Sequence, residues 1–372
     1  MREFFKKILL FISPLVILIL PAVFILWGTG ENFKSMNKTL LSNQEYLIGY
    51  AYNENNLKYL KWYYLSNAPK NDVVALGSSR VLQLRKNSFD ARFYNAGYSI
   101  KRIDQFIDFL RLIPSDKYPD YLIVSLDQWM FNAKRDPLAD TAFKDEWTKS
   151  FNKFPDAATI INVYEDLIKK KYSFGVVNNP FTIKLIGLNA RLNSKGIRND
   201  GSYFYGRQIA LLLDNNAAAN DFNFNNTKMR IEKGVLNFQT GNQLNTKALY
   251  ELDAFLAFCK THHIFVIAIL PPFPEEIYQL MNESGKYDYL NKLDSEIKPL
   301  FDAYGFELYN YTHITQFDYF DKEFLDGFHG GEKIYLQILI DILQNNSQLN
   351  HVSSLEKLQS DLKNRKSAFN VY

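Results

Sequence analysis

A serine early in the chain and an aspartate–histidine pair late in it are the residues best suited to chemistry. The serine lies in the segment GSSR (77–80), and the pair, Asp326 and His329, lies in LDGFHGGEKIY (325–335). An aspartate three residues before a histidine on a tight turn can direct its carboxylate to the imidazole Nδ1, so that Nε2 accepts a proton from a serine. The set predicts a serine nucleophile activated by a histidine base.

Each part of this set also has a purely structural interpretation. Ser78 or Ser79 can cap a helix that begins there, which is a frequent role of serine. His329 can equally be a loop histidine that has Asp326 close by in the sequence through chance. Agreement of several motifs, in order along the chain, is what favours the catalytic interpretation.

The elements that must position these residues follow an alternating pattern. DVVALG (72–77) is a short apolar run that predicts a buried strand, and SSRVLQLRKN (78–87) predicts the start of a helix. Ligands of open α/β sheets bind at the carboxyl ends of the strands, which is where GSSR then lies. Further predicted strands are 91–97, 121–126, 264–270 and 306–312, and further predicted helices are 103–113, 246–263, 275–283, 287–301 and 353–366. This alternation predicts an α/β protein with a parallel sheet and flanking helices.

The N-terminal region predicts a membrane anchor. Residues 8–27 form a run of 20 residues without charge, long enough at 1.5 Å per residue to cross a hydrocarbon core of about 30 Å. Arg2, Lys6 and Lys7 precede the run, so the positive-inside rule places the rest of the chain outside the cytoplasm, in the periplasm or at the cell surface. The alternative is a cleaved signal peptide, whose apolar region is usually about 7–15 residues long. The run here is longer and lacks a small-residue cleavage site.

We expect four segments along the chain: a transmembrane anchor at 1–30, a helical connector at 31–70, an α/β domain at 71–345 and a helical tail at 346–372. The regular pattern of the α/β domain is interrupted at about 130–243 by aromatic, asparagine-rich and basic stretches. An insertion of this kind suits a cap over a cleft.

Composition excludes several classes of function. The chain has 372 residues and a net charge of +3, and no stripe of lysine and arginine alternates with aromatic residues, so we expect no nucleic-acid partner. The single cysteine, Cys259, excludes an internal disulfide and a cysteine metal cluster, and its apolar neighbours predict a buried helix face. No histidine and carboxylate residues show metal-ligand spacing such as H-E-x-x-H. We therefore expect neither a metal nor another cofactor.

Taken in order, the motifs resemble the SGNH (GDSL-like) hydrolase superfamily over about residues 72–335. G-x-S after the first strand, NAG (95–97) and D-x-x-H near the end are similar to the first, second and last blocks of that family. The resemblance implies a three-layer, flavodoxin-like parallel sheet. It also makes Ser79 the nucleophile, because serine is the third residue of the family's G-D-S, with Ser78 in the place of the aspartate. It further implies an oxyanion hole formed by the N–H groups of Ser79 and Gly97.

The third family block, G-x-N-D, is where this sequence departs from the pattern. The corresponding segment is SLDQW (125–129), with Asp127 where the family has an oxyanion-binding asparagine. An ionised carboxylate cannot donate a hydrogen bond and would repel an oxyanion, so we expect Asp127 to be protonated, turned away or replaced by a donor such as Gln128. Arg80 lies at the start of a predicted helix, against its dipole. Either it contacts an acidic ligand or it is a solvated surface residue.

The resemblance implies acyl transfer through an acyl-Ser79 intermediate, with His329 acting first as base and then as acid. The anchor, the outward topology, GSSR and the segment ILPPF (269–273) look more like envelope acyltransferases than like secreted lipases. Those relatives include the D-alanyl-transfer protein of teichoic acid modification and the alginate-type O-acetylation proteins.

We therefore expect an enzyme that adds or removes an acyl group on an extracytoplasmic polysaccharide or other envelope glycopolymer. By the same resemblance, it would work beside a membrane-bound O-acyltransferase. Two alternatives stay open at this point. One is a simple carboxylesterase or lipase, and the other is a non-catalytic, membrane-tethered binding or scaffold protein.

Overall fold

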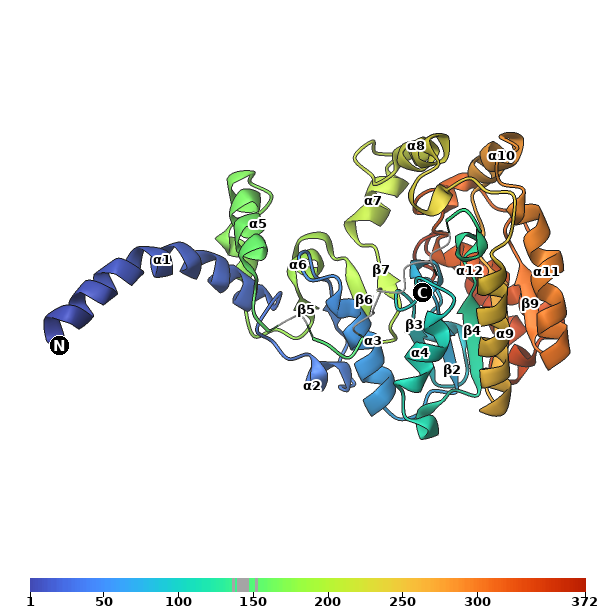
Figure 1. The fold of residues 1–372 in the computed structure, drawn as a ribbon, viewed down its shortest axis with the longest axis horizontal. Coiled ribbons are helices and arrows are strands. Elements are labelled where there is room, and N and C mark those ends of the chain that lie inside the picture. The colour runs from blue at the N-terminus through green and yellow to red at the C-terminus, as the bar shows by residue number, and fades with distance from the viewer. Residues whose placement is uncertain (136–137, 139–146, 151–152) are drawn as a thin grey trace. The chain divides into compact units, whose positions relative to one another are not determined.

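The computed structural model describes residues 1–135, 138, 147–150 and 153–372 (Figure 1). The chain forms two compact units. The smaller unit consists of Met1–Leu60, Thr148–Asn199 and Phe204–Arg207, and the larger unit consists of Lys61–Trp147, Asp200–Tyr203 and Gln208–Tyr372. The predicted connector (31–70) and the predicted insertion (130–243) are therefore each divided between the two units.

The larger unit contains a parallel sheet of five strands in the order β3-β2-β4-β8-β9. These strands are β2 (Val73–Leu76), β3 (Phe93–Ala96), β4 (Tyr121–Ser125), β8 (Phe265–Leu270) and β9 (Glu307–Asn310). All neighbours are parallel, and Leu76 lies opposite both Ala96 and Val124. Every residue of β2 and β3 is buried, as expected for parallel strands that have helices on both faces. The predicted α/β class with a parallel sheet is confirmed.

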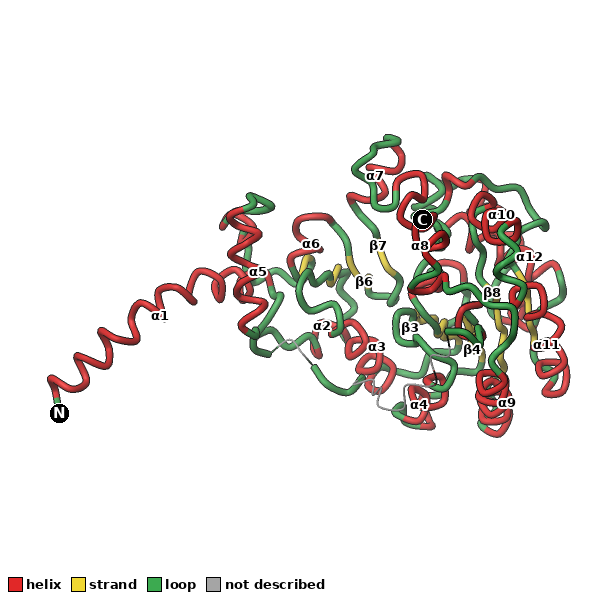
Figure 2. Tube along the Cα trace, turned by 45° about the horizontal axis from the view of Figure 1, so that its top comes forward, coloured by secondary structure: helices red, strands yellow, loops and turns green. Residues whose placement is uncertain are grey.

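Helices cover both faces of this sheet. On one face, α4 (Gln105–Arg111), α9 (Thr246–Thr261) and α11 (Tyr289–Tyr304) lie side by side (Figures 1 and 2). α12 (Glu332–Gln344) packs with α13 (Leu355–Lys363) on the other face. The remaining helices that reach into the larger unit are α3 (Asn56–Asn67), α7 (Arg207–Leu213), α8 (Asn225–Lys233) and α10 (Glu275–Glu283).

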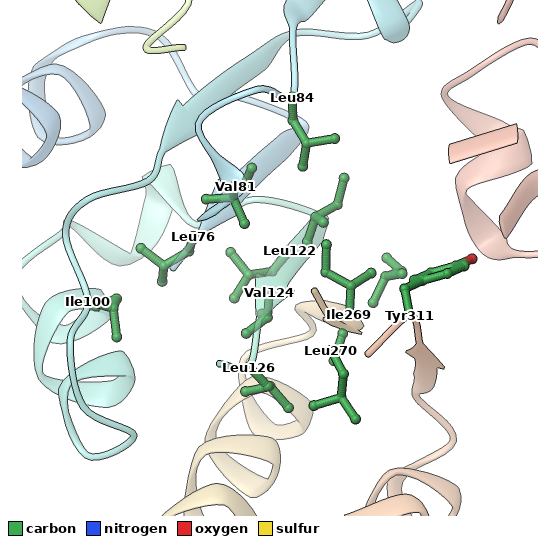
Figure 3. Close-up of a cluster of buried hydrophobic side chains, with 14 of the residues drawn as sticks. Leu76, Val81, Leu84, Ile100, Leu122, Val124, Leu126, Ile269, Leu270 and Tyr311 are labelled. Carbon is green, nitrogen blue, oxygen red and sulfur yellow. The ribbon is translucent and has the colours of Figure 1, made fainter. Parts of the chain in front are cut away.

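The core of the larger unit reaches the carboxyl edge of the sheet. Leu76, Val124 and Ile269 come from three neighbouring strands, and each is at most 1% exposed (Figure 3). Val81 and Leu84, from the segment that follows β2, belong to the same cluster. Full burial of such a side chain is worth about 1.5–3 kcal/mol, so this packing holds the residues beside Ser79 in place.

The helix predicted at 78–87 is wrong. The segment forms only two short 3-10 turns, Ser79–Val81 and Lys86–Ser88. Its carbonyl groups bond to residues far away in the sequence, because the Asn95 amide donates to the carbonyls of Val81 (2.7 Å) and Leu84 (2.9 Å). These carbonyls are therefore not available for the i to i+4 bonds of an α-helix.

The smaller unit contains a mixed sheet of four short strands in the order β5-β1-β6-β7, except that Tyr203 of β7 is assigned to the larger unit. Its central strand, β1, is parallel to β5 and antiparallel to β6. The strands are β1 (Leu47–Ile48), β5 (Leu185–Ile186), β6 (Gly196–Arg198) and β7 (Tyr203–Phe204), and the helices are α1 (Arg2–Thr29), α2 (Asn37–Leu40), α5 (Ala157–Ile168) and α6 (Leu188–Asn193). Strands of two or three residues are too short to give a periodic pattern, so the sequence did not predict this sheet.

Helix α1 carries the apolar run predicted as an anchor. Among the described residues, no single straight helix is long and apolar enough to cross a membrane. The pair Arg2–Pro14 and Leu18–Thr29, bent by 61°, meets the requirement together, as a broken span, a re-entrant loop or a signal sequence would. Pro14 and Pro21 flank the bend, and each removes a backbone donor from the helix.

Candidate active site

Ser79 and His329 form a direct hydrogen bond although 250 positions separate them in the sequence. The Ser79 Oγ lies 2.8 Å from the His329 Nε2, and the His329 Nδ1 lies 2.7 Å from the Asp326 Oδ2. Ser79 follows β2, while Asp326 and His329 lie on the turn before α12. This arrangement allows the imidazole to take the serine proton while the carboxylate stabilises the imidazolium that forms.

Backbone groups of its own turn hold the Asp326 carboxylate in place. Its Oδ1 accepts the N–H groups of Phe328 (3.0 Å) and His329 (2.9 Å), and the Leu325 N–H closes the turn on the His329 carbonyl at 2.7 Å. Burial would raise the pKa of Asp326, but His329 and these N–H groups outweigh that effect and bring the pKa below its ordinary value. The carboxylate is therefore ionised at neutral pH and can accept a hydrogen bond from the Nδ1–H group.

The two neighbouring serines have different partners. The Ser78 Oγ accepts the Arg80 N–H at 3.1 Å and so caps the turn, which leaves the Ser79 Oγ to face the imidazole. Gly77 permits the close approach of β2 and β4 at this point, because a Cβ there would lie 2.8 Å from the Ser125 Cβ. The cap predicted for one of the serines is thus found on Ser78.

Arg80 is not a surface residue, and that interpretation is corrected. Its guanidinium is fully buried between the rings of Trp129 and Phe273. The acceptors of its N–H groups are the Phe328 carbonyl (2.9 Å), the Gln128 Oε1 (2.7 Å), the Pro271 carbonyl (2.9 Å) and the Pro272 carbonyl. Arg80 therefore joins the serine turn to the histidine turn and to the end of β8. Its position directly before the largely apolar run VLQL (81–84) was the available signal for burial, since a charged side chain there needs internal partners.

The four residues predicted as oxyanion donors differ in whether their hydrogens already donate to another acceptor. In the described part of the chain, the Ser79 N–H has no acceptor. The Gly97 N–H donates to the Asn95 Oδ1 at 2.8 Å. Gln128 donates both amide hydrogens away from Ser79, to the Pro271 carbonyl (2.7 Å) and the Thr312 Oγ1 (2.9 Å). Ser79 is thus the candidate with an uncommitted hydrogen, and an oxyanion role for Gly97 or Gln128 requires a rearrangement.

Asp127, the fourth candidate, is completely buried. Its Oδ1 accepts the Ser125 hydroxyl at 3.1 Å and lies 3.9 Å from the nearest guanidinium nitrogen of Arg80. Its Oδ2 has no partner among the described residues. Burial raises the pKa of Asp127, and the charge of Arg80 offsets only part of that rise. The carboxyl group is therefore easier to protonate than an ordinary aspartate.

Two residues from the second half of the predicted insertion touch the histidine turn. The Asp221 Oδ2 accepts the Gly327 N–H at 3.0 Å, and the ring of Phe238 lies 5.9 Å from that of Phe328. A side chain on Gly327 would collide with Thr227. No sequence pattern indicates these contacts, because Asp221 lies in an asparagine-rich stretch without periodicity.

Over the described ranges, no three His, Cys, Asp or Glu side chains are grouped as a metal site. Cys259 is a free thiol buried on α9, where burial raises its pKa far above the ordinary value. No known protein family matches the chain, and no curated protein or solved structure matches it significantly. The chemistry of the site is therefore inferred from its own geometry.

Proposed function

We propose that this chain is a serine esterase or acyltransferase of the SGNH (GDSL-like) type, held at a membrane by α1. The observation that carries the proposal is the hydrogen-bonded series Ser79–His329–Asp326. The sheet supports it, because β3-β2-β4-β8-β9 corresponds to the order 2-1-3-4-5 that flavodoxin-like sheets share. The serine follows the first strand of that sheet, and the Asp-x-x-His turn follows the last.

In the proposed reaction, the Ser79 Oγ attacks the carbonyl carbon of an ester while its proton passes to the His329 Nε2. The tetrahedral oxyanion accepts the Ser79 N–H. Collapse breaks the bond to the leaving oxygen, which takes the proton from Nε2, and acyl-Ser79 remains. Water or an alcohol then gives its proton to Nε2, attacks the acyl carbon and restores the serine.

The proposed acceptor or substrate is an extracytoplasmic polysaccharide or other envelope glycopolymer. The apolar helix α1 supports this choice, because a membrane tether keeps the enzyme near lipid-linked or membrane-proximal polymers. A membrane-bound O-acyltransferase is the proposed partner, as the source or recipient of the acyl group.

A non-catalytic binding or scaffold protein is the second candidate. It is favoured because the Gly97 N–H and both amide hydrogens of Gln128 already donate to other acceptors. Of the candidate oxyanion donors, Ser79 is then the one whose N–H has no acceptor among the described residues. The two candidates differ in whether Ser79 reacts with an electrophile.

A fluorophosphonate probe on the full chain in neutral detergent tests the proposal. The wild-type protein and a Ser78→Ala control should be labelled, and Ser79→Ala should not. An unlabelled wild-type protein, beside a serine esterase that labels in parallel, would exclude the catalytic proposal. Labelling that survives Ser79→Ala would exclude this nucleophile. Turnover of p-nitrophenyl acetate without transfer to added saccharides would favour a simple carboxylesterase.

A further inference from the structure

The smaller unit exposes an unusual number of large apolar side chains. Soluble surfaces rarely gather such residues in a small region, and a contiguous patch marks an interaction site. The exposed fractions are 79% for Phe154, 57% for Ile161, 79% for Ile168, 51% for Phe174 and 79% for Phe181. Phe181 contacts Trp27 of α1, with 6.0 Å between the ring centroids.

Helix α5, which carries Ile161 and Ile168, packs directly along the C-terminal part of α1 (Figure 1). Ala22, Ile25 and Leu26 of α1 are completely buried in a cluster that includes residues of α5. The Tyr164 hydroxyl of α5 donates to the Leu18 carbonyl of α1. α5 therefore accompanies α1 over about its last three turns.

The length of α1 limits where the part that packs on α5 can lie relative to the hydrocarbon core of a membrane. The uncharged run begins at Ile8, and the first residue of α1 that is described as buried is Ala22. The 14 residues of 8–21 span only about 21 Å at 1.5 Å per residue, whereas the hydrocarbon core is about 30 Å thick. The bend of 61° shortens the span further. If α1 crosses the membrane, its packed part lies in the membrane too, and α5 lies beside it.

Positive charge adjoins the apolar residues. A hollow of about 770 Å³ in the smaller unit is lined by residues that include Lys34, Lys149 and Lys153, and none of the described residues that line it is a carboxylate. Phe33, which also lines it, packs edge-to-face on the exposed Phe154 at 5.8 Å. Apolar side chains next to lysines suit the outer layer of a bilayer that contains anionic lipids, where acyl chains adjoin phosphate groups.

We infer that the smaller unit is seated on the surface of an anionic lipid bilayer. α5 and the segment around Phe181 lie at the boundary between acyl chains and headgroups, and the lysine-lined hollow faces the lipid phosphates. The inference depends on the embedding of α1 that belongs to the proposed function, but it does not depend on the proposed chemistry at Ser79.

Fluorescence quenching in nanodiscs tests this placement. The full chain is reconstituted with phosphatidylglycerol and a doxyl-labelled phosphatidylcholine, and bimane is attached to single cysteines introduced at Ile161 or Phe181. Cys259 can stay, because it is buried. Phe11→Cys on α1 is the positive control, and Leu236→Cys and Phe320→Cys, which replace exposed apolar residues of the larger unit, are the negative controls.

Doxyl lipid should quench the labels at positions 161 and 181 at least twofold, as it does at position 11, and should leave positions 236 and 320 nearly unchanged. Quenching at position 11 without quenching at 161 and 181 overturns the inference. Absence of quenching at all positions overturns the embedding of α1 as well. Cross-links between copies through position 161, without quenching, would assign the surface to a second copy instead. Fluorophosphonate labelling of the same samples reports the Ser79 chemistry separately.

The preference of the lysine-lined hollow for anionic lipid is tested by a separate measurement. Acetylation of Lys149 and Lys153 by a water-soluble reagent is followed by mass spectrometry in nanodiscs of phosphatidylglycerol and of phosphatidylcholine. Phosphatidylglycerol should slow the modification of both lysines at least threefold relative to phosphatidylcholine. Lys298, an exposed lysine of the larger unit, is the control and should react equally in both. Equal reactivity of Lys149 and Lys153 in the two lipids would overturn the preference for anionic lipid.

Discussion

The Arg80 Nε–H donates to the Phe328 carbonyl at 2.9 Å. Arg80 directly follows the candidate nucleophile, Ser79, and Phe328 directly precedes the candidate base, His329, so this bond connects the two turns. The distance between the Ser79 Oγ and the His329 Nε2 therefore depends on a buried guanidinium that touches neither atom. The other N–H groups of Arg80 extend the connection to the end of β8, through the Pro271 and Pro272 carbonyls. Arg80 is a positioning residue in this arrangement.

Replacement of this guanidinium should slow the reaction of Ser79. Arg80→Lys keeps the charge but loses the planar fork, so it cannot reach the separate acceptors together. Loss of two such bonds, each worth about 1.5 kcal/mol, corresponds to a decrease of about 10²-fold in the rate of fluorophosphonate labelling. Arg85→Lys is a matched control, since Arg85 is paired with Asp200 and Glu332 and not with the histidine turn. Equal slowing in both variants would show a general loss of stability instead of positioning.

Asp326→Asn should abolish most activity and should also change the acid stability. An amide cannot stabilise the imidazolium, and a loss on the order of 10⁴-fold is expected for such a triad. The pKa of Asp326 is lowered in the folded state, so its contribution to the free energy of unfolding is complete above the ordinary pKa and disappears as the pH falls through the lowered one.

The measurement is the difference in unfolding midpoint between the wild-type protein and Asp326→Asn from pH 8 to pH 3. It should be constant above about pH 5 and shrink as the pH falls toward 3. Asp341→Asn on α12, which removes the charge of the carboxylate that accepts the Tyr311 hydroxyl, is the control and should leave the labelling rate unchanged. A full labelling rate in Asp326→Asn would contradict the proposed triad.

Asp127→Asn should raise the rate of Ser79 acylation. The buried Oδ2 has no partner among the residues that the structure describes. An amide N–H at that place would therefore have no acceptor of its own and could donate to the oxyanion. One oxyanion donor is worth about 10²-fold, which is the upper limit of the expected gain. Asp127→Ala removes the carboxylate without adding a donor. Equal rates in the two variants would attribute the change to the lost charge, and a slower Asp127→Asn would contradict the prediction.

The sequence predicted the five strands of the large sheet because each is a short segment between helical segments, and β2, β4 and β8 are largely apolar runs. Burial on both faces leaves β2 with no polar position, and such a run is recognisable without any tertiary information. The pairing of Ser79 with the Asp326–His329 turn was predicted from the Asp-x-x-His spacing and from the order of the motifs along the chain. Both segments follow strands at the carboxyl edge of one parallel sheet.

The conformation of 78–87 could not be predicted in the same way. Its local pattern favours a helix, but the Asn95 side chain and the Tyr203 N–H bind its carbonyls from distant positions. The burial of Arg80 likewise depends on acceptors from three separate loops. Contacts between residues so far apart leave no periodic signal in the sequence.

Lys61 of α3 should give the protein an unusual pH dependence of stability. Its ammonium is completely buried beside the Tyr94 ring and donates to the Asn95 carbonyl at 2.7 Å and to the Gly201 carbonyl. Burial lowers the pKa of Lys61 to about 7, although the charge of Asp200 opposes this shift. Above pH 7 the folded protein therefore loses a proton that the unfolded chain keeps until about pH 10.

Because the unfolded state binds more protons in this range, the Lys61 contribution makes the free energy of unfolding rise from pH 7 to pH 9, by at most about 1.4 kcal/mol per pH unit. Lys61→Met removes this contribution, so its stability relative to the wild-type protein should fall steadily over the same range in denaturant titrations. Lys357→Met, which removes an exposed lysine paired with Asp90, should keep the wild-type slope. Parallel pH profiles for the wild-type protein and Lys61→Met would mean that Lys61 keeps its proton when buried.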